Sequence, residues 1–299
     1  MSLKVLTATA ALMPGVPLNV HALVGERSSV LIDTGIAGMQ REILSLCREA
    51  GTLRDVLLTH AHADHIGNNR AVQQATGARF SAGGALPWIE DLERHYTEFT
   101  RTDALPDSQE QRRDILELMD GPVEVDWLIG EGARLRLGGG VELETLAFPG
   151  HKLEEIGFLE EESGTLIVGD VLLARAAPFF HGFESARAFR ASLAKLSALI
   201  EAGRARRVLS AHHPPLDATA ALAEVRATRA VLDEIEEATL AEADGRSFAE
   251  LWRGVSARCG KQAEFRGYAM LEAQVRELEQ AGALTVQGEQ IFSGSSGGM

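Results

Sequence analysis

Four side chains that can bind metal ions lie within six residues of one another in the segment "THAHADHIGN", residues 59–68: His60, His62, Asp64 and His65. Three apolar residues come directly before them, and such a run is typical of a buried strand. Because alternate residues of an extended chain point to the same side, His60 and His62 can bind one ion. Asp64 and His65 then face another ion. A single loop histidine is usually solvated, but four ligands in this spacing predict a metal centre.

Short apolar runs alternate with helical patterns through the first 215 residues, and this order predicts a layered α/β fold. The first series comprises residues 18–24, 30–33, 39–50, 56–58, 69–76 and 78–81. The second series comprises residues 134–137, 141–146, 156–159, 165–168, 185–202 and 208–209. We expect two sheets packed face to face with helices outside them. We also expect Asp64 to cap the helix over residues 69–76.

Two further regions depart from this alternation. Residues 85–120 are charged and compatible with helix, and a new helix is expected to begin at Asp107 or Ser108. We interpret them as a helical insertion that, together with Trp88, could form a lid. Residues 216–292 combine helical patterns with a short hairpin around Gly288, which predicts a small winged-helix-like domain. Its elements are expected at residues 218–243, 248–258, 268–281, 284–286 and 290–292.

Composition bounds the partners and the compartment of the chain. Acidic residues outnumber basic ones by 43 to 29, and the formal net charge of -14 makes a nucleic-acid partner unlikely. No apolar run approaches the roughly 20 residues that cross a bilayer, and the first residues do not resemble a signal peptide. Only Cys47 and Cys259 are present, which fits a cytoplasmic protein without a disulfide framework. The tail, residues 293–299, has a linker composition and is expected to be disordered.

Four later segments resemble motifs of the metallo-β-lactamase fold superfamily, as does the histidine segment itself. They are "VLIDTG" at 30–35, "FPGHKLEEIGF" at 148–158, "LIVGDVLL" at 166–173 and "LSAHHPP" at 209–215. The C-terminal pattern resembles the extension of the lactamase-β-like 2 group within that superfamily. This resemblance implies a four-layer αββα sandwich over residues 1–215, followed by the winged-helix-like domain.

The resemblance also implies seven metal ligands. They are divided between two ions: His60, His62 and His151 for the first, Asp64, His65 and His212 for the second, and Asp170 bridging both. Imidazole and carboxylate ligands without thiolate suit two zinc ions, although iron or manganese could use the same set. His213 competes with His212 for the last position, and the register favours His212. Asp33 is implied as a residue that supports a ligand.

The chain departs from the family motifs in two loops. Thr or Ser commonly follows the histidine of the third motif, whereas here residues 152–155 are Lys, Leu, Glu and Glu. That replacement leaves the usual hydrogen bonds of this loop in question. Glycines commonly flank the histidine of the fifth motif, and Ala211 and His213 replace them here. The backbone at that position is therefore expected to be more restricted.

Two neighbouring ions can lower the pKa of a shared water to roughly 7, which supplies hydroxide at neutral pH. We therefore predict a binuclear zinc metallohydrolase that cleaves an ester, thioester or lactone of a small metabolite, with Asp64 and Asp170 as catalytic residues. The apolar loop 11–19 could line its pocket. A segment beyond Asp170 could line it as well, with His181 as a polar group and with apolar surface from Phe179, Phe180 and Phe183. These three aromatic residues could equally pack into the core. His213 is a further candidate for substrate contact.

Two alternative functions remain open. A mononuclear iron persulfide dioxygenase shares the fold but uses fewer ligands. An endoribonuclease-like activity would use the C-terminal domain to bind RNA, but residues 215–299 carry 14 acidic and 8 basic side chains. Among hydrolases, no tyrosine lies shortly after Asp170, which weakens an acyl-homoserine lactone substrate. The C-terminal domain could instead support packing, a lid or a homodimer.

Overall fold

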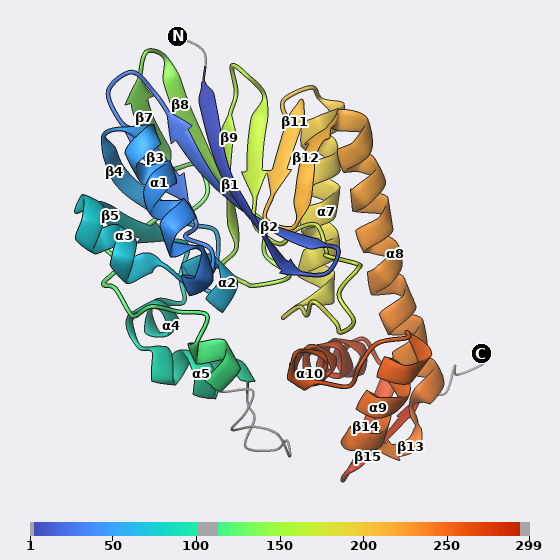
Figure 1. Ribbon diagram of the computed structural model, residues 1–299. Helices are drawn as coiled ribbons and strands as arrows, with labels where there is room; N and C mark the ends of the chain where they lie inside the picture. The colour runs from blue at the N-terminus through green and yellow to red at the C-terminus, as the bar shows by residue number, and fades with distance from the viewer. Residues whose placement is uncertain (1–2, 101–112, 294–299) are drawn as a thin grey trace.

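The computed structural model describes residues 3–100 and 113–293, and its main body is a pair of six-stranded sheets (Figure 1). The strands of the first sheet lie side by side in chain order: β1 (Lys4–Met13), β2 (Val16–Val24), β3 (Ser29–Ile32), β4 (Leu53–Leu58), β5 (Arg79–Ala82) and β6 (Trp127–Leu128). The second sheet is also in chain order: β7 (Arg134–Gly138), β8 (Val141–Ala147), β9 (Ile156–Glu160), β10 (Thr165–Val168), β11 (Arg207–Ser210) and β12 (His213–Asp217). Strands β3 to β6 are parallel, and so are β10 and β11.

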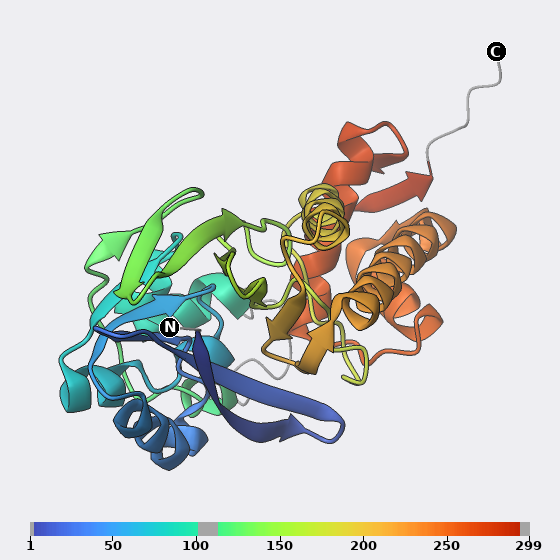
Figure 2. The same ribbon diagram turned by 90° about the horizontal axis from the view of Figure 1, so that it is seen from above.

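The two sheets pack face to face, with helices on their outer faces. Apolar side chains fill the space between the sheets, among them Ile32 and Leu57 from the first sheet and Phe158 and Ile167 from the second. Helix α1 (Gln40–Ala50) contacts the first sheet, while α7 (Ala186–Glu201) and α8 (Ala218–Glu242) lie beside the second (Figures 1 and 2). Residues 30–32 of β3 and 56–58 of β4 are continuous apolar runs because both faces of these strands are buried there. The predicted αββα sandwich is confirmed.

Four strands were not predicted, namely β1, β6, β12 and the β13 strand (Asp244–Ser247) of the C-terminal region, and β1 is the longest of them. β1 alternates exposed and half-buried small residues, so it lacks the apolar signal of the central strands. It pairs with β2 along its whole length, from Lys4 opposite Val24 to Met13 opposite Val16. Residues 11–19 are therefore the end of a hairpin, and the prediction of a loop there was wrong.

Short helices flank β5, and those that follow it lie in the predicted insertion. α2 (Ala63–Ile66) and α3 (Asn69–Thr76) precede β5, and α4 (Leu86–Glu90) and α5 (Leu92–Thr100) follow it. The predicted cap of α3 was wrong, because no Asp64 side chain caps it. The Asp120 carboxylate instead accepts hydrogen bonds from the amides of Arg70 (3.1 Å) and Ala71 (2.7 Å). Asp107 and Ser108 lie outside the described residues.

The C-terminal region continues from α8 through a strand, two helices and a hairpin. Its elements are β13 (Asp244–Ser247), α9 (Phe248–Arg258), α10 (Phe265–Gln280), β14 (Leu284–Gln287) and β15 (Gln290–Ser293). Ser247 and Glu250 form a capping box at the start of α9, which explains why that helix was visible in the sequence. The winged-helix label stays a prediction, and so does the domain boundary at residue 215. Strand β12 crosses that residue, and one apolar core joins Leu166 and Phe189 to Leu271 beyond it.

The remaining chain-level prediction concerns membranes. Within residues 3–100 and 113–293, no helix is both long and apolar enough to span a bilayer. Residues 294–299 of the predicted tail lie outside the described part of the chain.

Candidate metal centre

The seven predicted ligand residues meet at one edge of the paired sheets. Each follows the end of a strand: the histidine segment follows β4, and the others follow β8, β10 and β11. Parallel strands bring their carboxyl ends to the same edge, which is why residues far apart in sequence converge here. The segment is packed tightly against the turn after β3, since a Cβ at Gly67 would lie 2.4 Å from the carbonyl oxygen of Gly35. The convergence agrees with the prediction, and the binding of ions remains a prediction.

One group of ligand atoms matches the predicted first ion. The ligand atoms of this group all lie within 4.8 Å of one another, and they come from His60, His62, His151 and Asp170. His151 Nε2 is 2.9 Å from His62 Nδ1 and 3.4 Å from Asp170 Oδ2. Two ring nitrogens and a carboxylate oxygen therefore point at one small volume.

A second group matches the other predicted ion, and it comes from Asp64, His65 and His212. His212 Nε2 lies 3.3 Å from Asp64 Oδ2 and 3.3 Å from Asp170 Oδ1. Asp170 Oδ1 is also 3.4 Å from His65 Nε2. The two oxygens of Asp170 thus face different groups, which is the arrangement that a bridging carboxylate needs.

Hydrogen bonds on the far side of the rings fix their orientation. Nδ1 of His151 donates to the carbonyl oxygen of Gly182, and Nδ1 of His212 donates to that of Pro17, both at 2.9 Å. A carbonyl can only accept, so in each neutral ring Nδ1 carries the proton and Nε2 presents a lone pair to the cluster. His65 Nδ1 likewise lies 2.9 Å from a carboxylate oxygen, Asp33 Oδ2, which leaves its Nε2 facing the cluster. This pattern is typical of histidines that bind metals.

Asp33 supports the ring of His65, as predicted, and Thr59 holds the Asp33 carboxylate in place. The Asp33 carboxylate accepts hydrogen bonds from the Thr59 amide (2.7 Å) and from the Thr59 hydroxyl (2.8 Å). Asp33 adopts a left-handed backbone conformation with φ of 60° at the end of β3. Aspartate tolerates this conformation better than most residues, and three hydrogen bonds to its side chain hold it there.

The donor atoms of the cluster fit a positively charged ion. The buried Nε2 atoms of His60, His65 and His212 and the buried Oδ1 atom of Asp170 have no hydrogen-bond partner in the described protein. Burial lowers the pKa of His60 well below its usual value, so that ring is neutral, as a metal ligand must be.

His212, which lies beside two carboxylates, has a raised pKa, in contrast to His60. Burial alone would lower the pKa of His212, but the carboxylates of Asp170 and Asp64 outweigh it and raise the pKa to about 10. The carboxylates therefore attract positive charge into the cluster. The residues fit metal ions by ligand type, orientation and charge.

Glu155 is a buried residue of the site whose role the sequence did not indicate. Its Oε1 accepts a hydrogen bond from the amide of the ligand Asp170 (2.6 Å), and its side chain is almost fully buried. Burial, followed by the nearby Asp170 charge, raises the pKa of Glu155 well above its usual value. The only signal in the sequence was a departure from the family motif in the loop after His151.

That loop is ordered by contacts of its own. The Lys152 ammonium pairs with Glu184 and lies 3.7 Å above the ring of Trp88. The carbonyl of Lys152 accepts from the amides of Gly150 (3.0 Å) and Glu155 (3.3 Å). A charged side chain thus ties the loop down where the family commonly has a hydroxyl residue.

Asn19 orders the loop around His212, and no pattern in the sequence indicated this role. Its side-chain amide donates to the carbonyl oxygens of Ser210, Ala211 and His213, at 3.1, 3.1 and 2.8 Å. These partners lie about 190 residues away in the chain, so no local pattern could reveal them. The position of His212 therefore depends on β2 of the other sheet.

The predicted substrate contacts divide into two sets. His181 lies beside the cluster, with Nδ1 3.6 Å from Asp170 Oδ2, and Phe179 lines the cavity above it. Phe180 packs instead into the apolar core, so the prediction that it faces the substrate was wrong. His213 belongs to none of the ligand groups and lines neither cavity at the cluster. The geometry favours His212 over His213 as the ligand.

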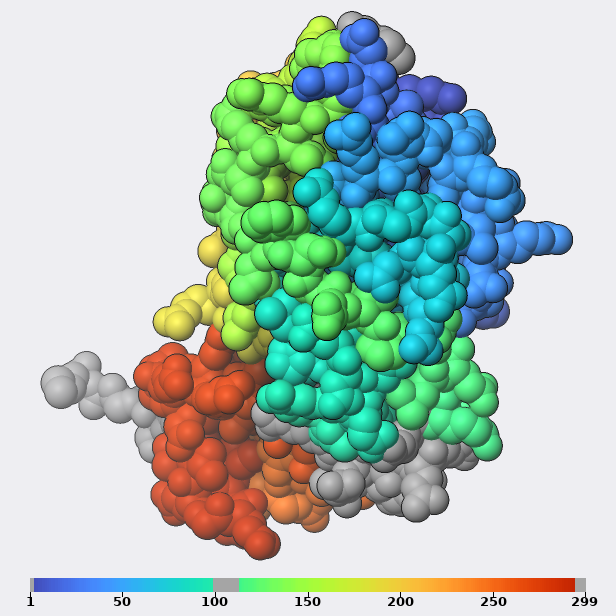
Figure 3. Space-filling view, turned by 90° about the vertical axis from the view of Figure 1, so that its left-hand side faces the viewer, coloured from blue at the N-terminus to red at the C-terminus, as the bar shows by residue number. Residues whose placement is uncertain are grey.

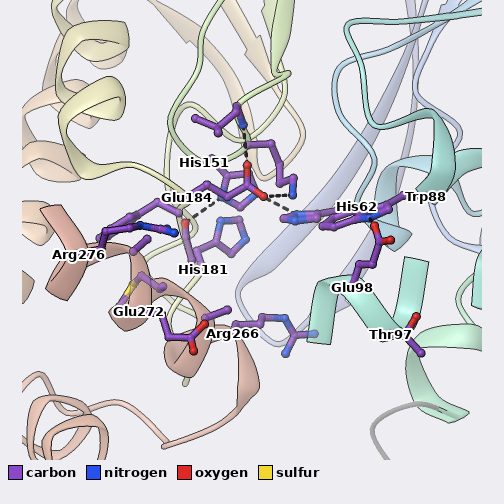
Figure 4. A pocket seen from close by; sticks show the side chains of 17 residues that line it. His62, Trp88, Thr97, Glu98, His151, His181, Glu184, Arg266, Glu272 and Arg276 are labelled. Atoms are coloured by element: carbon purple, nitrogen blue, oxygen red, sulfur yellow. Dashed lines mark hydrogen bonds and ion pairs between the residues drawn. The ribbon is translucent and has the colours of Figure 1, made fainter. Parts of the chain in front are cut away.

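Two adjoining cavities open onto the cluster, and Arg266 of α10 lines both. The larger has a volume of about 630 Å³ and lies between α5 and α10 (Figure 4). The smaller has a volume of about 450 Å³ and reaches the β1–β2 hairpin. His62, His151 and His181 also line both cavities, so the cluster lies where they meet.

Comparison with known proteins places the chain in a family. A model of the metallo-β-lactamase superfamily matches residues 13–212. The chain belongs to this superfamily of metal-dependent hydrolases.

The sequence relatives match only part of the chain. The hydroxyacylglutathione hydrolase of Cereibacter sphaeroides (strain ATCC 17025 / ATH 2.4.3) is 33% identical over 150 residues, which are 49% of this chain and 44% of that protein. Hydroxyacylglutathione hydrolase GloC of Haemophilus influenzae is 29% identical over 148 residues, 49% of this chain and 62% of that protein. The chain thus spans less than two thirds of the length of the curated relatives that it matches.

Two solved structures share the fold over nearly the whole chain. A metallo-β-lactamase family protein from Thermus thermophilus superposes with a TM-score of 0.71 and 23% identity, covering 97% of this chain and 98% of that one. A β-lactamase domain protein from Burkholderia ambifaria gives a TM-score of 0.69 and 20% identity, covering 95% and 94%. The fold likeness therefore extends through the C-terminal region.

Proposed function

We propose that this chain is a metal-dependent hydrolase of a thioester or a related ester of a small metabolite. One observation carries the proposal: seven ligand residues, five of them histidines, converge beside a cavity large enough for a metabolite, and four of the seven line it. The preference for thioesters is supported by the relatives named hydroxyacylglutathione hydrolases, because an acyl group carried on the sulfur of glutathione is a thioester.

The residues of the chain divide the work in this proposal. His60, His62 and His151 would hold one ion. Asp64, His65 and His212 would hold the other, and Asp170 would contribute to both. Bound ions would supply Lewis acidity toward the carbonyl and lower the pKa of a water molecule. Zinc is the metal that we propose, on the basis of the ligand types.

The remaining chemistry belongs to side chains that face the cavity. Asp64 lines the smaller cavity, and its carboxylate would orient the attacking water and accept its proton. Hydrolysis forms a bond from the water oxygen to the acyl carbon and breaks the bond from carbon to sulfur. The thiolate that leaves takes up one proton. Small molecules are the proposed partners, and the cytoplasmic location, the homodimer and the absence of nucleic-acid binding remain predictions.

The test combines metal analysis with a substrate panel. Purified protein would be analysed for zinc, iron and manganese, and then assayed against thioesters, lactones and aryl esters. We expect about two ions per chain and fastest hydrolysis of thioesters. One iron per chain together with oxygen consumption on a persulfide would replace this proposal with the dioxygenase alternative. Hydrolysis that persists in the metal-free protein would refute it.

A further inference from the structure

We infer that the substrate is amphiphilic, with an apolar acyl chain in the smaller cavity and an anionic thiol part in the larger one. This inference rests on the proposed function and names the substrate class for the same site. The smaller cavity is called the apolar chamber and the larger one the polar chamber. Arg266 lies between them and selects the charged side of the substrate.

The apolar chamber is walled by hydrocarbon side chains from three separate segments. They are Leu12, Met13 and Val16 of the hairpin, Ile115 and Leu118, and Phe179. Its floor contains Asp64 and Asp170 of the cluster. The lining also includes charged side chains away from the floor, Asp114 and Arg266, but the six hydrocarbon side chains form a surface on which a chain of methylenes would bind. An acyl chain entering it would bring its carbonyl carbon to the cluster.

The polar chamber has a different lining (Figure 4). Trp88, Thr97 and Glu98 form one side, while Arg266, Glu272 and Arg276 of α10 form the other. In the space-filling view, the segment that contains α4 and α5 lies directly against the C-terminal region (Figure 3). This larger chamber therefore suits the bulkier and more polar thiol part.

In this chamber three basic side chains stand beside three acidic ones, and the two arginines keep N–H groups for a ligand. Arg276 is exposed and makes no hydrogen bond or ion pair with any residue that the structure describes. The Arg266 guanidinium uses Nη1 for a hydrogen bond to Glu264 (2.6 Å), which leaves other N–H groups for a ligand. Lys152, by contrast, is already paired with Glu184. Arginines with unoccupied N–H groups are suited to binding a carboxylate or a phosphate.

Arg266 is also held in place where the chambers meet. Its guanidinium lies 4.5 Å from the Phe179 ring and 4.4 Å from the Phe265 ring, and it pairs with the partly buried Glu264. Two rings and a carboxylate limit its motion, so that binding a carboxylate or phosphate costs little ordering of the side chain. Figure 4 shows Arg266 in the cavity near His62 and His181.

The experiment uses the metal-loaded full chain and matched thioesters. Acetyl, butyryl and hexanoyl groups would each be joined to N-acetylcysteamine, which is neutral, and to N-acetylcysteine, which adds one carboxylate. We expect kcat/KM to rise by about fourfold for each added methylene that the chamber accepts. We expect the carboxylate to raise kcat/KM by about tenfold or more, as a charge-assisted hydrogen bond does.

Variants assign these preferences to the two chambers. Arg266→Gln should reduce the carboxylate preference to near unity, and Arg276→Gln should reduce it by a smaller factor because that side chain is more exposed. Arg229→Gln, on the exposed surface of α8, makes the same change in net charge and should keep the preference. Met13→Trp should lower the ratio of hexanoyl to acetyl hydrolysis by filling the apolar chamber.

Controls separate folding from recognition. Arg266→Gln leaves Glu264 without its partner, so the double variant Glu264→Gln with Arg266→Gln removes both charges, and thermal unfolding of each variant is recorded. A carboxylate preference that persists in both variants would overturn the inference, and so would equal rates for acetyl and hexanoyl thioesters. If the metal-loaded protein hydrolyses no thioester at all, the proposed function fails. If it hydrolyses thioesters without these preferences, only the inference about the substrate fails.

Discussion

The floor of the cavity and its walls are built in different ways. Floor residues follow strand ends and are fixed by buried hydrogen bonds, such as that from His151 to the carbonyl of Gly182. Wall residues come from the hairpin tip, short helices and α10, and several of them are half exposed, including Met13 and Arg266. A rigid floor preserves the chemistry, whereas walls from separate segments can determine the substrate without disturbing the ligands.

The strongest test of the floor is Asp170→Ala. Asp170 faces both ligand groups and is almost fully buried, so its loss removes a ligand from each. We expect kcat/KM to fall by more than the roughly 10- to 100-fold loss that is typical of residues that only support a ligand. Metal content, measured by atomic emission, should fall with activity. Asp233→Ala on the surface of α8 is the control, and equal losses in both variants would contradict the assigned role.

Removal of the metal ions should destabilise the floor. Ions that bind the folded chain at 100 times their Kd would contribute about 2.7 kcal/mol to the free energy of unfolding. A chelator should therefore lower the Tm, and zinc should restore it. An unchanged Tm after complete removal of bound metal would show that the cluster holds no ion that contributes to stability.

Asp33→Asn tests how the floor is held without touching an ion ligand. Asparagine keeps the left-handed backbone conformation of Asp33, but its single oxygen cannot accept from His65 and from both Thr59 groups. We expect metal affinity to fall by roughly 10- to 100-fold. Titration of the metal-free variant with zinc would measure this, and excess zinc should recover most of the activity. Wild-type affinity would contradict the role of the carboxylate.

The walls should respond more weakly than the floor. Phe179→Ala removes a ring that lies against Arg266, and a cation–π contact at such a site contributes about 0.5 to 1 kcal/mol. We expect a two- to fivefold rise in KM with unchanged metal content. Loss of metal in this variant would show that floor and walls are coupled, against the comparison drawn above.

Much of the floor could be predicted because its signal is local. His60, His62, Asp64 and His65 lie within six residues, and the length of each segment fixes which side chains can reach an ion. The central strands were predicted for a similar reason, since their apolar runs reflect burial on both faces. β1 was missed because an edge strand with small residues carries little of that signal.

Residues that act across the fold could not be predicted. Asp120 rather than Asp64 caps α3, and Asn19 holds the loop around His212 from about 190 residues away. Phe179 and Phe180 are adjacent and chemically identical, yet one lines the cavity and the other is buried in the core. The direction of the backbone at these two residues decides which side chain faces the cavity, and their identical chemistry gives no sign of it.

By itself, the sequence determined the chemistry of the site: which groups can bind ions, and the strands that carry them. Only the tertiary structure decided what surrounds those groups, including the two chambers and the place of Arg266 between them. The physical reason is the range of the interactions. Ligand spacing and strand burial act over a few residues, whereas cavity walls form where separate segments happen to pack together.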